Sequence, residues 1–264
     1  MKLAFIGGGV MGEAMIGGVL RNALAKPADV AACDVLAQRR DHLASTYGIT
    51  TADKPASVLE GASIVVLAVK PQEFPAAARS LSLKPGQTVM SIMAGVTIAA
   101  IRDALHHDAI VRAIPNTPAQ IGEGMTVWTA TEAVPEPARE EVRGILAVLG
   151  QELYVDDEKY VDMATAVSSS GPAYVFLVME AWIDGAVHIG LRRDVAQRMV
   201  IQTILGSAKY AQVTGKHPAD LRNQVTSPAG TTTEGLRALE KAGLRLAFIE
   251  AVQAAYDKAR RLGG

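Results

Sequence analysis

The chain lacks the features that mark several large classes of protein. Its 264 residues include one cysteine, Cys33, so no disulfide can form within the chain and a cysteine-based metal site is disfavoured. The formal net charge is -1 and no basic run carries interleaved aromatics, so nothing indicates a nucleic-acid-binding surface. No segment reaches the roughly 18–20 uninterrupted apolar residues of a membrane span. We therefore expect a cytoplasmic protein whose partners are small molecules and copies of itself, with no nucleic acid and no membrane among them.

Hydrolytic and metal-dependent chemistry also lack their usual residues. The five histidines form no HExxH or other metal-binding pattern, and no G-x-S-x-G elbow is present. Aromatic residues make up 5% of the chain and apolar residues 49%, a composition that suits closely packed helices. These absences favour redox chemistry on a bound nicotinamide over hydrolysis.

Short apolar runs alternate with helical segments in the first part of the chain. The runs KLAFI and SIVVLAV have the length and composition of buried parallel strands. Strands that alternate with helices predict an α/β fold with a Rossmann-like, doubly wound parallel sheet. The expected strands cover residues 2–6, 30–33, 63–69, 87–92, 109–114, 125–129 and 152–155.

The pattern changes near residue 157, beyond which no β-like alternation occurs. Gly190, Gly215 and Gly243 stand where helices are expected to end. We therefore expect a dinucleotide-binding Rossmann domain over residues 1–156, followed by an all-helical C-terminal domain over residues 157–264. The expected helices of that domain cover residues 157–169, 172–190, 194–214, 218–225, 232–242 and 244–261.

A glycine-rich loop carries the first functional signal. It contains G-x-G-x-x-G as Gly7, Gly9 and Gly12, directly after an expected strand and at the opening of an expected helix. The first glycine permits a tight turn, the second lets the backbone approach a pyrophosphate, and the third lets the helix pack on the strand. Free N–H groups and the dipole of the helix N-terminus attract phosphates. The loop therefore predicts a dinucleotide site.

Asp34 bears on which dinucleotide binds. It ends the second expected strand, at about the 20-residue spacing from the loop that dinucleotide-binding folds show. A carboxylate there accepts hydrogen bonds from the adenosine ribose, which favours NAD, and repels the 2′-phosphate of NADP. Arg39 and Arg40 follow, and they either offset that repulsion or belong to a solvated helix face. NADPH and NADH both remain open as cofactors.

Two other strand ends offer polar residues at the same edge of the sheet. Lys70 follows one strand and either meets the cofactor or is an ordinary strand-end lysine. Asn116 stands in a proline-flanked turn after another strand, where its amide either binds the nicotinamide or substrate or shapes the turn.

The segment Ser227–Thr233 is the most unusual part of the helical half. Hydroxyl groups and a glycine gather immediately before an expected helix. Exposed backbone N–H groups with several hydroxyls form a good carboxylate receptor without a cationic side chain. The same residues also suit an elaborate helix cap, and the residues alone leave these two interpretations evenly balanced.

Several segments resemble the pyrroline-5-carboxylate reductase family over nearly the whole chain. They are GGGVMGEAMIGG, AVKPQ, MAGV, RAIPNTPAQIGEG, SSSGPAYVF and LRNQVTSPAGTTTEGL, in the order that the family shows. The resemblance implies hydride transfer from NADPH or NADH to the C=N carbon of 1-pyrroline-5-carboxylate, which gives L-proline in the final step of proline biosynthesis. It also implies a helical dimerisation module, and hence a homodimer or a larger dimer-based oligomer.

The resemblance assigns roles to individual residues. It places the substrate carboxylate at Ser227, Gly230 and Thr231, and it places Thr232 nearest the ring nitrogen as the catalytic, orienting residue. Together with the loop argument above, the expected cofactor-binding residues are Ile6, Gly7, Gly8, Gly9, Val10, Met11, Gly12, Asp34, Ala68, Val69, Lys70, Pro71 and Asn116.

Three residues depart from the family pattern. Ala229 stands where glycine is usual, so a positive φ at this position would be strained. Ser169 replaces the first glycine of the usual G-S-G-P. Asp34-Val35 stands where many NADPH-using members carry a polar residue followed by arginine, which puts recognition of a 2′-phosphate in doubt.

Other functions remain as alternatives. A 6-phosphogluconate-type hydroxyacid dehydrogenase also joins a Rossmann domain to a helical one, but it would need a catalytic lysine in a motif that is not recognisable here. A deazaflavin-dependent NADP reductase would not need the Ser227–Thr233 segment. A dinucleotide-sensing dimer without catalysis is the alternative from a different class.

Overall fold

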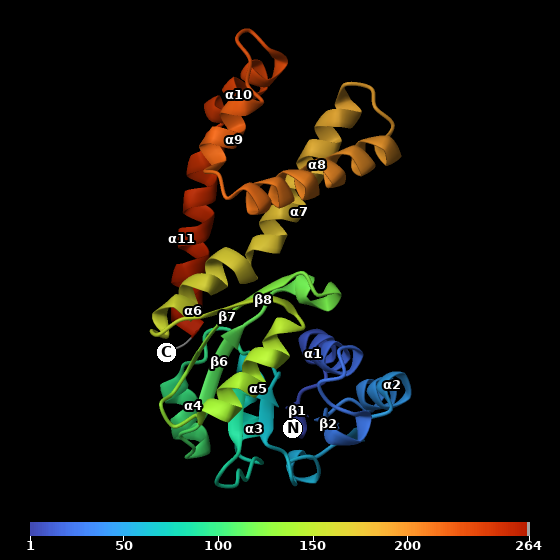
Figure 1. Ribbon diagram of the computed structural model, residues 1–264, viewed down its shortest axis with the longest axis vertical. Helices are drawn as coiled ribbons and strands as arrows, with labels where there is room; N and C mark the ends of the chain where they lie inside the picture. The colour runs from blue at the N-terminus through green and yellow to red at the C-terminus, as the bar shows by residue number, and fades with distance from the viewer. Residues whose placement is uncertain (263–264) are drawn as a thin grey trace. The chain divides into compact units, whose positions relative to one another are not determined.

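The computed structural model describes residues 1–262, which form a sheet-containing unit and a helical unit (Figure 1). The first unit comprises Met1–Pro172 with the residues from Ala254 onward, and the second comprises Ala173–Gln253. The last strand ends at Tyr154, close to the expected domain boundary, whereas the compact units divide after Pro172. The boundary between residues 156 and 157 therefore stays a prediction.

One sheet of eight strands organises the described part of the first unit, in the order β3-β2-β1-β4-β5-β6-β7-β8. The order reverses between β1 and β4, which makes this the topological switch point where ligands bind in open α/β sheets. The strands are β1 Leu3–Ile6, β2 Val30–Cys33, β3 Thr50–Ala52, β4 Ile64–Leu67, β5 Thr88–Ser91, β6 Ile110–Ile114, β7 Gly124–Ala130 and β8 Gly150–Tyr154.

The expectation of a wholly parallel sheet is wrong at one pair, because β6 and β7 run antiparallel. Residues 115–123 connect these strands, and they contain only the short 3-10 helix Thr117–Ile121. A parallel return requires a crossover of about a dozen residues or more, usually with a helix. The short proline-containing connection therefore reverses the chain, while β8 pairs parallel to β7 after a full helical crossover.

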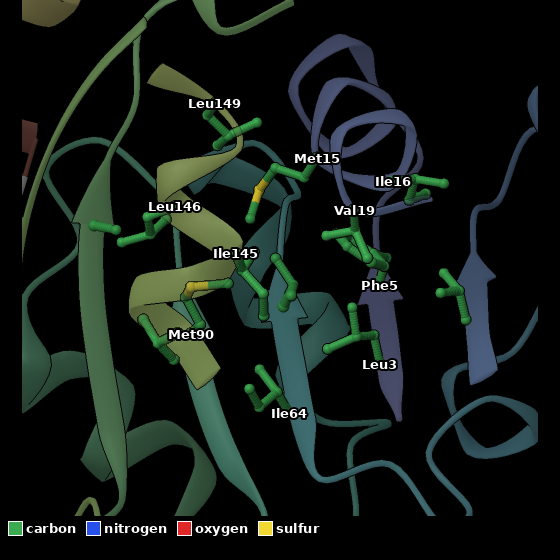
Figure 2. Close-up of a cluster of buried hydrophobic side chains, with 14 of the residues drawn as sticks. Leu3, Phe5, Met15, Ile16, Val19, Ile64, Met90, Ile145, Leu146 and Leu149 are labelled. Atoms are coloured by element: carbon green, nitrogen blue, oxygen red, sulfur yellow. The ribbon is translucent and has the colours of Figure 1, made fainter. Parts of the chain in front are cut away.

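Helices cover both faces of the sheet, and the strands alternate their side chains between them. Leu3 and Phe5 pack with Met15 and Ile145 on one face (Figure 2), whereas Ile6 belongs to the cluster on the other face. Helices α1, α2 and α5 contribute to the first cluster, and α3 and α4 contribute to the second. The helices are α1 Val10–Arg21, α2 Ala37–Tyr47, α3 Phe74–Ala78, α4 Ile98–Leu105, α5 Glu136–Ala147 and α6 Lys159–Ala164.

A buried arginine ties α6 to the sheet. Arg112 on β6 is 1% exposed, and its guanidinium contacts Glu158 at 2.6 Å and Asp162 at 2.5 Å. Glu158 also accepts a hydrogen bond from the backbone N–H of Ile98, the first residue of α4. A buried charge needs such partners to offset its desolvation. These bonds fix the start of α6, which continues into a π-helical turn at Thr165–Ser169.

The helical unit has almost no core of its own. Within residues 173–253, all of which the structure describes, the buried hydrophobic side chains are Ala196 and Val200 alone. Gly190, Gly215 and Gly243 have positive φ and end helices, as predicted. Among residues 1–262, no helix combines the length and apolar content needed to cross a membrane. The helices are α7 Gly171–His188, α8 Arg193–Thr214, α9 Pro218–Gln224, α10 Thr231–Lys241 and α11 Leu244–Leu262.

Candidate functional site

Two glycines of the first loop are required by close packing at the switch point. Gly7 follows β1 with φ +101°, and a Cβ added to it would lie 2.6 Å from the carbonyl oxygen of Ala68. A Cβ on Gly12 would lie 2.6 Å from the carbonyl oxygen of Gly7. A side chain at either position would therefore push β1, α1 or the end of β4 apart. The predicted roles in the turn and in helix packing are confirmed.

Gly9 has the opposite surroundings. It is the N-cap residue of α1, and an added Cβ would meet no described atom within 4 Å. No side chain of the described residues caps this helix end, so the N–H groups of its first turn face outward unpaired. These donors and the positive end of the helix dipole suit a pyrophosphate. The loop therefore fits the phosphates of a dinucleotide.

Gly8 is held by side chains from the segment after β2. Asp34 Oδ2 accepts a hydrogen bond of 2.8 Å from the Gly8 N–H, and Arg39 Nε donates one of 2.8 Å to the Gly8 carbonyl. A Cβ on Gly8 would lie 2.5 Å from Leu43 Cδ1. Because its N–H is already paired, Gly8 shapes the loop, and the phosphate donors come from the residues that follow it.

Glu13 connects the first two helices beneath this loop. Its carboxylate contacts Arg39 at 2.6 Å, His42 Nε2 at 2.7 Å and the hydroxyl of Tyr47 at 3.2 Å. Burial by itself would raise the pKa of Glu13, but the hydrogen bonds from Arg39 and His42 outweigh it and hold that pKa below its usual range. Arg39 is thus neither a solvated side chain nor a free cation, a role that the sequence did not predict.

Cys33 lies beside Asp34, and its thiol is unreactive. Burial, followed by the negative charges of Asp34 and Asp53, raises the pKa of its thiol to about 11. A thiol with such a pKa stays protonated near neutral pH and is a poor nucleophile. The lone cysteine therefore contributes packing at the end of β2.

The end of β4 borders the glycine loop. The Ala68 N–H donates to the carbonyl of Ile6 at 2.8 Å, so the two strand ends lie side by side. Lys70 is exposed, and Pro71 opens a 3-10 turn that leads into α3. The segment Ala68–Pro71 is therefore brought next to the loop, as a cofactor-binding role requires.

Asn116 is engaged at both ends of its amide. Its Nδ2 donates to the carbonyl of Ser168 at 3.0 Å, and its Oδ1 accepts from the N–H of Met125 at 2.9 Å. The side chain thus joins the π-helical turn at Thr165–Ser169 to the start of β7. Contact between Asn116 and a cofactor stays a prediction, while its structural role follows from these two bonds.

The Ser227–Thr233 segment forms an uncapped helix start in the helical unit. The carbonyl of Ser227 accepts from the Gly230 N–H at 3.1 Å and from Thr233 Oγ1 at 2.8 Å. Gly230 is the N-cap of α10, and within the described residues no side chain caps this helix end. The hydroxyl of Thr233 therefore holds the turn, while the N–H groups of Thr231 and Thr232 begin a helix without side-chain partners. The missing side-chain cap argues against the elaborate cap, and carboxylate binding at this helix start stays a prediction.

Ala229 has φ 55° at the centre of this segment. The left-handed region costs roughly 1–2 kcal/mol for a residue with a Cβ. The strain expected from alanine at this position is therefore confirmed.

Comparison with known proteins identifies relatives of both parts of the chain. A family model described as pyrroline-5-carboxylate reductase dimerisation matches residues 158–262. A second model, described as NADP oxidoreductase coenzyme F420-dependent, matches residues 2–95. The pyrroline-5-carboxylate reductase of Synechocystis sp. is 39% identical over 100% of this chain and 98% of its own, and that of Pseudomonas aeruginosa is 37% identical over 99% and 96%.

The chain belongs to the pyrroline-5-carboxylate reductase family.

Solved structures of the family share the fold over the whole length. The reductase of Coxiella burnetii has a TM-score of 0.90 and 33% identity, and the two chains cover 100% and 98% of each other's length. The Plasmodium falciparum enzyme, solved with NADP bound, has a TM-score of 0.90 and 29% identity over 100% and 98%. The model described as NADP oxidoreductase coenzyme F420-dependent ends at residue 95, so its match covers only part of the sheet-containing unit.

Gly9→Ala tests the pyrophosphate cradle. A methyl group there meets no protein atom, so the free energy of unfolding should change by less than about 1 kcal/mol. The methyl group would occupy the ligand's place, so the dissociation constant for NADH should rise at least about tenfold. Gly144→Ala, in α5, is a matched control that also meets nothing within 4 Å and should leave NADH binding unchanged. Unchanged binding by Gly9→Ala would remove the pyrophosphate from this loop.

Ala229→Gly tests the strain in the second segment. Glycine adopts the left-handed conformation without strain but loses more backbone entropy on folding. The free energy of unfolding, measured by thermal unfolding, should therefore rise by about 0.5–1 kcal/mol. The control Ala242→Gly, at an exposed position with φ −76°, should instead destabilise the protein slightly. Destabilisation by both substitutions would contradict strain at Ala229.

Proposed function

We propose that this chain reduces the C=N bond of 1-pyrroline-5-carboxylate to give L-proline, with NADPH or NADH as the hydride donor. Membership of the family supports this activity. The open, uncapped helix start at Gly9 is the single structural observation that supports binding of the cofactor. An enzyme of this kind completes proline biosynthesis.

The cofactor-binding residues each have a defined task in this proposal. The N–H groups of Val10 and Met11 bind the pyrophosphate, and Gly9 leaves room for it. Asp34 faces the adenosine ribose, and Ala68–Pro71 lines the path toward the nicotinamide. The nicotinamide, when bound, supplies the hydride that the imine carbon receives. Ile6, Gly7, Gly8 and Gly12 act through the backbone shape of the loop, with Val69, Lys70 and Asn116 as the remaining proposed contacts.

The substrate is held through its carboxylate at the start of α10. The hydroxyl of Ser227 and the N–H group of Thr231 provide donors without a fixed positive charge, while Gly230, whose N–H is bonded to the Ser227 carbonyl, contributes the shape of the turn at which the carboxylate binds. Thr232 lies one residue further into the helix, where its hydroxyl orients the ring nitrogen. We propose it as the catalytic residue of the reaction in this orienting sense.

This chemistry does not require a strong acid. A protonated imine is already electrophilic, so the main task is to hold two planar groups at reacting distance. Such orientation contributes on the order of 7–11 kcal/mol to lowering a reaction barrier. The absence of a histidine from the two proposed binding segments is therefore compatible with catalysis.

The helical unit assembles with a second copy. The matching family model describes a dimerisation domain, which indicates a dimer-based oligomer. Large apolar side chains line its helices, among them Leu177 on α7, Leu205 on α8 and Ile249 on α11, each at least 58% exposed. A unit with two buried hydrophobic residues gains its core from a partner. We propose a homodimer, or a larger assembly of such dimers, that completes the active site.

Ile249→Glu tests this assembly. A charge in the centre of a buried apolar interface is strongly unfavourable, so the variant should elute at the mass of one chain while the parent elutes at twice that mass or more. Glu250→Gln, at the neighbouring exposed position, should leave the assembly unchanged. A parent chain that is monomeric would contradict the proposal.

Turnover tests the function directly. Purified protein with 1-pyrroline-5-carboxylate should consume NADH or NADPH, with L-proline as product. Thr232→Val removes one hydroxyl at nearly constant volume and should lower kcat/KM at least about tenfold without changing the dissociation constant of the cofactor. Thr214→Val, at the end of α8, is the control and should have no effect. Cofactor binding without turnover would favour the non-catalytic sensing dimer.

A further inference from the structure

We infer that this chain selects NADH over NADPH, and that Asp34 is the residue that makes the selection. The inference rests on the proposed function, because it concerns the same cofactor site. The relative from Plasmodium falciparum was solved with NADP bound, so the inference sets this chain apart from that enzyme.

The carboxylate of Asp34 is fixed at the place where the ribose is expected. Cys33, the last residue of β2, pairs with Ile6, the last residue of β1, so Asp34 stands directly beside the glycine loop. Its Oδ2 accepts from the Gly8 N–H at 2.8 Å, and its Oδ1 accepts from the Leu36 N–H at 2.9 Å. Two backbone donors on different segments therefore prevent the carboxylate from turning away from the loop.

The geometry leaves the carboxylate able to accept more hydrogen bonds. A carboxylate offers about four lone-pair positions, and the two backbone N–H groups occupy two of them. The ribose of NADH presents two neighbouring hydroxyls, which match the two positions that remain. A 2′-phosphate replaces one hydroxyl donor with negative oxygens that only accept, and it would face the negative charge of Asp34.

The two arginines that follow Asp34, Arg39 and Arg40, already bond other groups of the protein. Arg39 bonds the Gly8 carbonyl and forms an ion pair with Glu13 at 2.6 Å. Arg40 Nη1 donates to the carbonyl oxygens of Asp34 at 2.9 Å and of Val35 at 3.1 Å, so it supports the backbone that carries the carboxylate. A contact between Arg39 and a 2′-phosphate would compete with its pairing to Glu13, and Arg40 would have to use its remaining N–H groups while Nη1 stays on the backbone of this turn.

The residue after Asp34 provides no compensation. Val35 is 84% exposed and apolar, so the first residue after Asp34 offers no positive charge to a 2′-phosphate. The turn thus combines one fixed negative charge with an uncharged neighbour. Both features act against NADPH, and the first also favours NADH.

Binding of the two cofactors to the full chain, measured by their fluorescence without substrate, tests the inference. The parent should bind NADH at least tenfold more tightly than NADPH. Asp34→Ser combined with Val35→Arg should shift this ratio at least tenfold toward NADPH. Val35→Arg alone keeps the bonds of Asp34 to the loop, so it should strengthen NADPH binding several-fold and leave NADH binding unchanged.

Asp53→Ala is the matched control. Asp53 follows β3 at the same sheet edge, and its negative charge also reaches Cys33, but it makes no hydrogen bond to the loop. It should leave the ratio unchanged. Competition by 5′-AMP and by 2′,5′-ADP isolates the 2′ position, and the parent should bind 5′-AMP more tightly.

The possible failures can be told apart. A parent that binds NADPH as tightly as NADH, or a double variant with an unchanged ratio, overturns the selection by Asp34. Turnover of 1-pyrroline-5-carboxylate with either cofactor would then leave the proposed function intact. Binding of neither cofactor would overturn the site, and with it both proposals.

Discussion

The close approach of β1 to β4 at the switch point is the constraint on which the candidate cofactor site depends. The Gly7 backbone lies against the carbonyl of Ala68 with no space for a Cβ, and Gly12 lies equally close to Gly7. These contacts set the direction in which α1 leaves the sheet. They therefore decide where the unpaired N–H groups of its first turn point, and so where a pyrophosphate can bind.

Side chains from the neighbouring β2–α2 segment then hold the loop in that shape. Asp34 and Arg39 bond the two sides of the Gly8 residue, and Glu13 holds Arg39 in place. The loop is thus organised before any ligand arrives, which reduces the ordering that binding requires. The same bonds remove Arg39 from the set of cations that could neutralise a 2′-phosphate.

Much of this arrangement follows from local patterns. The glycine spacing placed the loop, and the apolar runs placed most strands, because strand burial and helix starts leave direct marks in sequence. The prolines within residues 115–123 predict a turn after a strand, but they do not predict that the chain reverses there, so the antiparallel β6–β7 pair is missed. The strand Thr50–Ala52 and the helix Glu136–Ala147 were also missed. The first is a three-residue edge strand without an apolar run.

Contacts between residues far apart in the chain were not predictable in this way. The amide of Asn116 is suited to a ligand contact, yet its partners are the backbone N–H of Met125 and the carbonyl of Ser168. Ser168 lies 52 residues further along the chain. The pairing of Arg39 with Gly8 and Glu13 likewise depends on how α1 and α2 pack. Conversely, the strain at Ala229 was foreseen from the residue type, because only glycine adopts the left-handed region without cost.

The helical unit contains the proposed substrate-binding segment, Ser227–Thr233. Like the glycine loop, this segment ends in a helix start that no side chain of the described residues caps, at Gly230. A crystal structure of the chain with NADH and L-proline tests the central claim most directly. The account predicts the pyrophosphate over the N–H groups of Val10 and Met11, and the proline carboxylate at Ser227 and Thr231 with Thr232 beside the ring nitrogen. A dinucleotide bound away from Gly9, or a proline whose carboxylate lies elsewhere, would contradict it.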